Sequence, residues 1–66
     1  MKKKEQWMFK GALVLALGKK ATITAMQENN LDGTDYVYYI DCKLEGKKHS
    51  DRYHPNDVKE LIVVES

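Results

Sequence analysis

Residues 53–61 have the sequence Tyr53-His54-Pro55-Asn56-Asp57-Val58-Lys59-Glu60-Leu61, and the apolar run Ile62-Val63-Val64 follows directly. Proline fixes φ and has no backbone donor, so Pro55 predicts the end of the strand before it. Asn56 and Asp57 favour a tight turn, because their side chains bond nearby backbone amides. The spacing of Val58 and Leu61 predicts one 3₁₀ turn at about residues 55–60, with both side chains inward. We expect residues 61–64 to form a short final strand that closes a small β-barrel.

Strands are also predicted upstream of this turn. Residues 21–26 alternate with a period of two and contain β-branched side chains, which is typical of a strand. Residues 29–33 have the composition of a turn, residues 34–44 form the clearest strand, and a hairpin at 45–47 leads to a returning strand at 49–53. With a period of two in the long strand, the inward face carries Tyr36, Tyr38, Ile40, Cys42 and Leu44, and the outward face carries Val37, Tyr39, Asp41 and Lys43.

The N-terminal third of the chain leaves two structures open. Residues 1–5 are charged, and we expect them to be frayed and disordered. The large apolar residues at 7–9 either lead into the first strand or pack across one end of the barrel. Residues 11–18 form either a helix or a strand, because a short apolar run cannot be assigned from its period. Gly11 disfavours one long helix, so a strand from about Leu13 is preferred.

Composition limits the class of protein. The chain has 66 residues, of which 42% are hydrophobic and 32% charged, which fits one soluble globular domain over residues 1–66. A net charge of +1 argues against strong non-specific attachment to nucleic acid. The single cysteine excludes an internal disulfide and favours a reducing compartment, so we expect a cytoplasmic protein. The longest apolar run is too short to cross a membrane, and charged residues interrupt a signal-peptide pattern.

The order of the predicted elements resembles a Src-homology-3-like small barrel. The similarity is clearest over residues 52–64, where the chain carries Tyr53, Pro55, Asn56 and Val58. Residues 11–14, ahead of Gly18, are also similar to the opening of KOW- and Tudor-type relatives. The resemblance implies a mainly β fold of about five antiparallel strands, with Tyr53 and Pro55 in structural positions.

The resemblance does not extend to polyproline binding. Peptide-binding members of that group use an acidic, tyrosine-rich first loop and a tryptophan beside the peptide groove. Here Trp7 is the only tryptophan and precedes the first predicted strand, and residues 28–35 lack the aromatic signature. The resemblance therefore implies the fold and not the ligand.

No residue pattern predicts a reaction. His49 and His54 could bind zinc together with Cys42 or an aspartate. Their spacing, however, does not match the usual zinc-site pattern, in which the ligands come as two closely spaced pairs. Cys42 falls on the predicted inward face, where a thiol behaves as a small hydrophobic group. The aspartates lack the spacing of a calcium loop, and no glycine-rich phosphate loop is present. We therefore expect no catalytic, cofactor-binding or metal-binding residue, and a protein that is not an enzyme.

A basic hairpin with aromatic neighbours is the main candidate surface. Phosphates pair with cations and bases stack on aromatic rings, so such a surface suits single-stranded nucleic acid. The same charges could serve only to keep a small barrel soluble and its edges unpaired. Tyr39 is the best single residue for a protein contact, although a cross-strand pair would equally account for it. The candidate contact residues are Tyr39, Lys43, Lys47, Lys48, Arg52 and Tyr53.

Three functions remain open from the sequence. The first is a non-enzymatic binding module that contacts another, unidentified protein through an exposed edge or aromatic patch. The second is nucleic-acid binding through the basic hairpin. The third is a homodimer, instead of a monomer, that covers residues 12–17, which would otherwise be an aggregation-prone edge.

Overall fold

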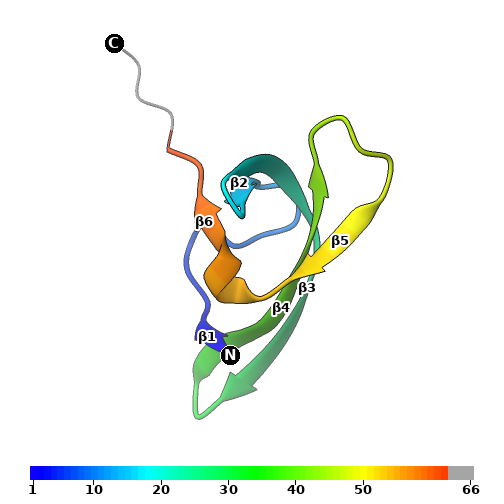
Figure 1. Cartoon of the computed structure of the whole chain (residues 1–66). Helices are drawn as coiled ribbons and strands as arrows, with labels where there is room; N and C mark the ends of the chain where they lie inside the picture. Colours follow the sequence, from blue (N-terminus) through cyan, green and yellow to red (C-terminus); the bar gives the residue numbers. More distant parts are fainter. Residues whose placement is uncertain (63–66) are drawn as a thin grey trace.

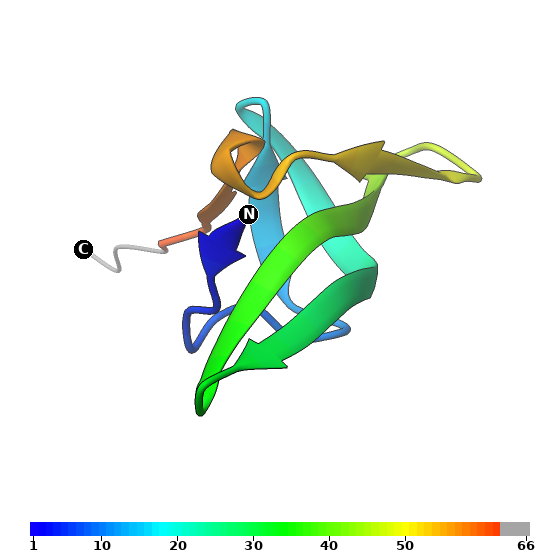
Figure 2. The ribbon, with the colours of Figure 1, turned by 90° about the horizontal axis from the view of Figure 1, so that it is seen from below.

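Six strands and one turn of 3₁₀ helix make up residues 1–62, the part of the chain that this computed structural model describes. Strands contain 60% of these residues, every pairing is antiparallel, and the sheet curls into a half-barrel (Figures 1 and 2). The order in the sheet is β1-β4-β3-β2-β6, and β5 also pairs with β4. The elements are β1 (Lys2–Lys3), β2 (Leu13–Ala16), β3 (Lys19–Leu31), β4 (Thr34–Leu44), β5 (Ser50–Tyr53), η1 (Pro55–Asp57) and β6 (Val58–Glu60).

The hairpin of β3 and β4 is longer than predicted because its turn is shorter. Only Asp32 and Gly33 lie outside the two strands, with φ of 52° and 79°, as a type I′ turn requires. The predicted turn over 29–33 is therefore wrong for residues 29–31, which belong to β3. The Asn30 side chain still supports the turn, because it accepts a hydrogen bond from the Gly33 amide (3.2 Å).

A β-bulge decides which side chains of β4 face the core. Gln27 pairs with Tyr39 and Glu28 with Val37, which leaves Tyr38 as the extra residue of β4. A bulge shifts the alternation by one residue, so Val37 is wholly buried and Tyr38 is 40% exposed. The predicted inward face is wrong at Tyr38 and, by the same alternation, at Tyr36, and the outward placement of Val37 is also wrong. The prediction is confirmed for the buried residues Ile40, Cys42 and Leu44.

Residues 13–16 form a strand, as preferred over a helix from the sequence. Val14 and Ala16 point into the core, while Leu13 is 65% exposed. A two-residue turn, Leu17–Gly18, connects β2 to β3 with φ of 50° and 80°. The left-handed region costs a non-glycine side chain about 1–2 kcal/mol, and asparagine tolerates it best. Leu17 is therefore a strained residue at a position that suits asparagine.

Replacing Leu17 by asparagine is expected to stabilise the fold. The Leu17→Asn substitution creates an Asn-Gly type I′ turn and removes an exposed leucine, so the free energy of unfolding rises by about 0.5–1 kcal/mol. Urea unfolding followed by circular dichroism measures the change. Leu13→Asn is the matched control, because asparagine is disfavoured in a strand and should give no gain. An unchanged or lower unfolding midpoint for Leu17→Asn would contradict the strain at this turn.

The N-terminal segment is ordered, which corrects the expectation of a disordered stretch at residues 1–5. Residues 2–3 form β1 and pair with residues 36–37 of β4, beyond the end of the β4–β5 pairing. The Lys4 amide donates to the Asp35 carbonyl (2.9 Å), and the Lys4 side chain forms an ion pair with Glu28. Backbone pairing does not depend on apolar side chains, so a lysine run completes the free edge of β4.

The predicted 3₁₀ turn is present as η1, and the strand after it starts earlier than expected. Val58 donates its backbone amide to the Pro55 carbonyl and already has extended dihedral angles, so pairing with β2 begins there. Within residues 1–62 the last strand is therefore residues 58–60, and the predicted strand is wrong at residues 61 and 62. Residues 63 and 64 of that prediction lie outside the described residues. His54 caps η1, because its Nδ1 accepts a hydrogen bond from the Asn56 amide (3.1 Å).

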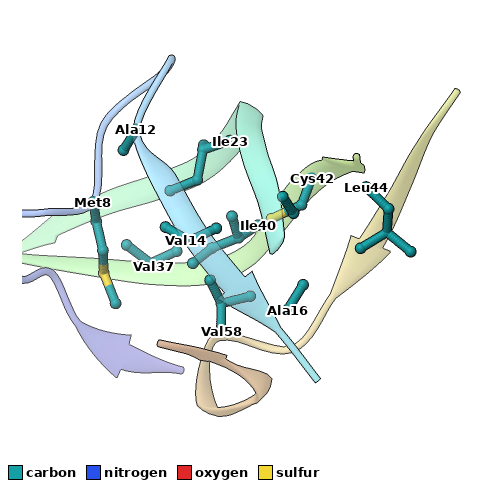
Figure 3. Close-up of a cluster of buried hydrophobic side chains, with 11 residues drawn as sticks. Met8, Ala12, Val14, Ala16, Ile23, Val37, Ile40, Cys42, Leu44 and Val58 are labelled. Atoms are coloured by element: carbon teal, nitrogen blue, oxygen red, sulfur yellow. The ribbon is translucent and has the colours of Figure 1, made fainter. Parts of the chain in front are cut away.

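The concave side of the sheet holds the core (Figure 3). Met8 enters this core from the segment before β2 and is wholly buried, whereas its neighbour Phe9 is 54% exposed. Trp7, Met26 and Tyr53 are half-buried and pack against it. The fully covered hydrophobic residues are Met8, Ala12, Val14, Ala16, Ala21, Ile23, Val37, Ile40, Cys42, Leu44 and Val58.

Candidate functional site

The β4–β5 hairpin carries the basic residues that the sequence singled out. Lys43 lies in β4 opposite Ser50, while Lys47 and Lys48 lie in the loop between the strands, and all three are exposed. No ion pair joins any of these three lysines to another residue within 1–62. Residues 41–52 contain these three lysines and Arg52 against three carboxylates, so the hairpin is only slightly cationic.

Arg52 is engaged within the hairpin. Its Nε donates to Asp41 Oδ1 (3.1 Å), the residue directly opposite in β4. Its guanidinium carbon also lies 3.6 Å from the centre of the Tyr39 ring, a cation–π arrangement. The hydrogen bond to Asp41 is the main cause that raises the pKa of Arg52. Tyr39 therefore makes the cross-strand pair that was the alternative explanation for this residue.

Tyr53 lies apart from the other candidate contact residues. It pairs with Ile40, a buried residue, so its side chain shares the inner face and is half-buried against the core. Burial, followed by the charge of Asp51, raises the pKa of Tyr53. Tyr39 and Arg52 lie on the outer face, with Asp41. The hairpin thus places the two tyrosines on opposite faces of the sheet.

Cys42 is wholly buried in the core. Burial, with a smaller contribution from Asp41, raises the pKa of the Cys42 thiol to about 11. A covered, protonated thiol is neither a nucleophile nor a metal ligand, because both roles need the accessible thiolate.

Cys42 is expected to resist thiol reagents at about pH 8 while the chain is folded, and to react on unfolding. The pKa of Cys42 in the fold exceeds its ordinary value of 9.0, so the unfolded chain loses the thiol proton first. Stability should therefore fall as the pH rises from about 9 to about 11. Thiol-labelling rates and the pH dependence of urea midpoints measure both effects, and Cys42→Ala should lack this part of the pH dependence. Fast labelling in native buffer would contradict the expectation.

The outer face of β2, continued by the turn residue Leu17, is a side-chain surface that the sequence did not indicate, although residues 12–17 were expected to form an exposed edge. Leu13, Leu15 and Leu17 follow each other on alternate positions, and we call them the leucine surface. Leu13 and Leu17 are each 65% exposed, and Leu15 is half-buried. Because β2 pairs with both β3 and β6, residues 13–16 are not the sheet edge that the sequence suggested. The exposed feature is a side-chain face, and its backbone is already hydrogen-bonded.

Two hollows border the leucine surface. One, of about 450 Å³, includes Leu13 and Leu61 together with the basic residues Lys20 and Lys43 and the acidic Glu45. The other, of about 410 Å³, lies at the opposite end of β2. Its lining residues are Leu15, Leu17, Gly18, Asn56, Asp57 and Lys59.

Within residues 1–62, no group of three or more histidine, cysteine, aspartate or glutamate side chains is placed to hold a metal ion. The same part of the chain contains no helix of the length and hydropathy that crossing a membrane requires. Comparison with models of protein families, with curated proteins and with solved structures found no match.

Proposed function

We propose that this chain is a non-enzymatic binding module that contacts another protein through the leucine surface. The observation that supports the proposal is the exposure of Leu13 in β2 and of Leu17 in the turn that follows it, 65% each. Grouped exposed apolar side chains mark interaction sites more often than chance exposure does. A binding role also agrees with the burial of Cys42, which removes the one thiol from contact with a substrate.

A Src-homology-3-like barrel is the fold that we propose for this module. The antiparallel half-barrel supports it, as does the 3₁₀ turn η1 before β6, where Pro55 is buried and Tyr53 packs against the core. The proposed contact surface nevertheless differs from an aromatic peptide groove, because it consists of aliphatic side chains on β2 and in the turn after it.

Site-specific photo-crosslinking tests the proposed function. A photoreactive amino acid at position 13 is expected to crosslink a defined protein in a lysate of the source cells. Excess wild-type chain should compete for that product, whereas excess Leu17→Asn chain should not. Lys48 is the control position, because it lies in the β4–β5 loop. The proposal fails when position 13 yields no product beyond that from position 48, or when nuclease treatment removes the product.

Nucleic-acid binding is the second candidate. It is favoured by the lysines of the β4–β5 hairpin, which form no ion pair with any other residue of the described range 1–62. An amide-resolved NMR titration with a mixed-sequence single-stranded oligonucleotide, at low and moderate salt, separates it from the first. Saturable, salt-sensitive shifts at Lys43, Lys47 and Lys48 would support this candidate, since phosphate contacts weaken with salt. An unchanged spectrum would remove it.

A further inference from the structure

We infer that the leucine surface binds a protein segment that carries both apolar and acidic side chains. This inference rests on the proposed function and names the chemistry of its partner. Two independent features of the described residues carry it. The first is the set of lysines around the leucines, and the second is the strained backbone of Leu17.

Lysines flank the leucine surface on both sides. Leu15 pairs with Lys20 of β3 and with Lys59 of β6, so a lysine residue neighbours it on each side in the sheet. Lys43 lines the same hollow as Leu13. None of these lysines forms an ion pair with another residue of the described part of the chain. A partner that buries the leucines would therefore meet lysine side chains that are not paired within residues 1–62.

The two hollows differ in charge, which suggests how the partner is oriented. Lys20 and Lys43 line the hollow beside Leu13, against the single carboxylate of Glu45. The hollow at Leu17 contains one lysine and one aspartate, so it is balanced. Acidic side chains of the partner should therefore lie toward Leu13, and its apolar side chains should extend toward Leu17.

The backbone strain at Leu17 does not serve the fold. Asparagine or glycine would make the same turn at lower cost, yet the chain places an exposed leucine there. Residues held in sparsely populated conformations concentrate at functional sites, where their side chains are used. In the isolated chain the Leu17 side chain is exposed. Contact with a partner would give that side chain a role.

A second copy of this chain fits the surface less well than an acidic segment does. A two-fold contact would place the same patch on both sides, so the lysines around one leucine surface would face those around the other. Like charges across an interface are costly. Single-stranded nucleic acid would neutralise the lysines but would leave the aliphatic leucines without a matching apolar partner.

Fluorescence anisotropy with a labelled synthetic peptide tests the inference. The peptide contains leucine and glutamate residues separated by serine. Two control peptides replace its glutamates by lysine or its leucines by serine. We expect the original peptide to bind at least ~10-fold more tightly than either control, because burial of one leucine and charge pairing are each worth about that factor. Binding should also weaken with added salt.

Variants separate binding from folding. Leu17→Asn should weaken peptide binding about 10-fold, although its thermal midpoint rises by a few degrees, so the loss cannot come from unfolding. Replacing Lys20 and Lys59 together by glutamate should remove the preference for the acidic peptide. Leu31→Asn and Lys48→Glu are matched controls in other parts of the chain, and both should bind as wild type does.

Four results would overturn the inference. They are equal affinity for the lysine peptide, no binding of the acidic peptide, full binding by Leu17→Asn, and competition by a single-stranded oligonucleotide. Concentration-dependent sedimentation that Leu17→Asn abolishes would assign the surface to a second copy instead. A specific crosslink at position 13 without acidic-peptide binding would reject the partner chemistry alone, whereas failure of both experiments would also reject the proposed function.

Discussion

Ile40→Ala is expected to leave most of the chain unfolded at 25 °C. Ile40 is wholly buried in the middle of β4, where it pairs with Met26 of β3 and Tyr53 of β5. Truncating such a residue costs about 2–5 kcal/mol. A fold of this size rarely has more than about 3–5 kcal/mol of stability. Far-ultraviolet circular dichroism and urea titration measure the loss.

Ile62→Ala is the matched control for this substitution. Ile62 is 72% exposed, so the same loss of side-chain atoms should change the free energy of unfolding by no more than about 0.5 kcal/mol. A cost below about 1 kcal/mol for Ile40→Ala would show that the centre of β4 does not hold the core together.

Met8→Ala is expected to have the second largest effect, about 2–5 kcal/mol of destabilisation. Met8 belongs to the loop before β2, yet it is wholly buried, and its sulfur accepts a hydrogen bond from the Glu5 amide (3.3 Å). Its removal would open a cavity at one end of the core. Thermal unfolding followed by Trp7 fluorescence measures the effect, because Trp7 packs against the same core.

Phe9→Ala provides the control for Met8→Ala. Phe9 is adjacent in sequence and larger, but it is 54% exposed. Its truncation should therefore lower the free energy of unfolding by about 0.5 kcal/mol or less. Equal losses for the two substitutions would mean that the segment is held as a whole and not by the buried methionine.

The elements that depend on local chemistry were predictable from the sequence. Pro55 with Asn56 and Asp57 indicated the 3₁₀ turn, and the strand from Leu13 followed from a glycine that disfavours a helix. The inner face of β4 was only half predictable. The bulge at Tyr38 arises from how β4 meets β3, and no local signal in β4 indicates it. The pairing of β1 was equally hidden, since it uses backbone groups.

The leucine surface escaped prediction because every residue from 12 to 17 is apolar, so the run does not show which alternate set faces solvent. The smaller residues of this run, such as Val14 and Ala16, face the core, and the larger leucines face outward. A tightly curled sheet has little space inside, which is the physical reason for that order. The alternation of small and large apolar residues was therefore the signal from which the outward face could have been predicted. The basic hairpin was found from sequence, but the engagement of Arg52 with Asp41 needed the strand register.

The late position of β6 in the chain has a consequence for protein synthesis. β2 is complete at residue 16, but its second neighbour, β6, begins only at residue 58. A nascent or truncated chain that stops before Val58 exposes one backbone edge of β2, beside an apolar stretch. Such chains should pair with one another or recruit chaperones until β6 is available to pair with β2. Truncation before residue 58 is thus expected to produce aggregates and not merely a weaker fold.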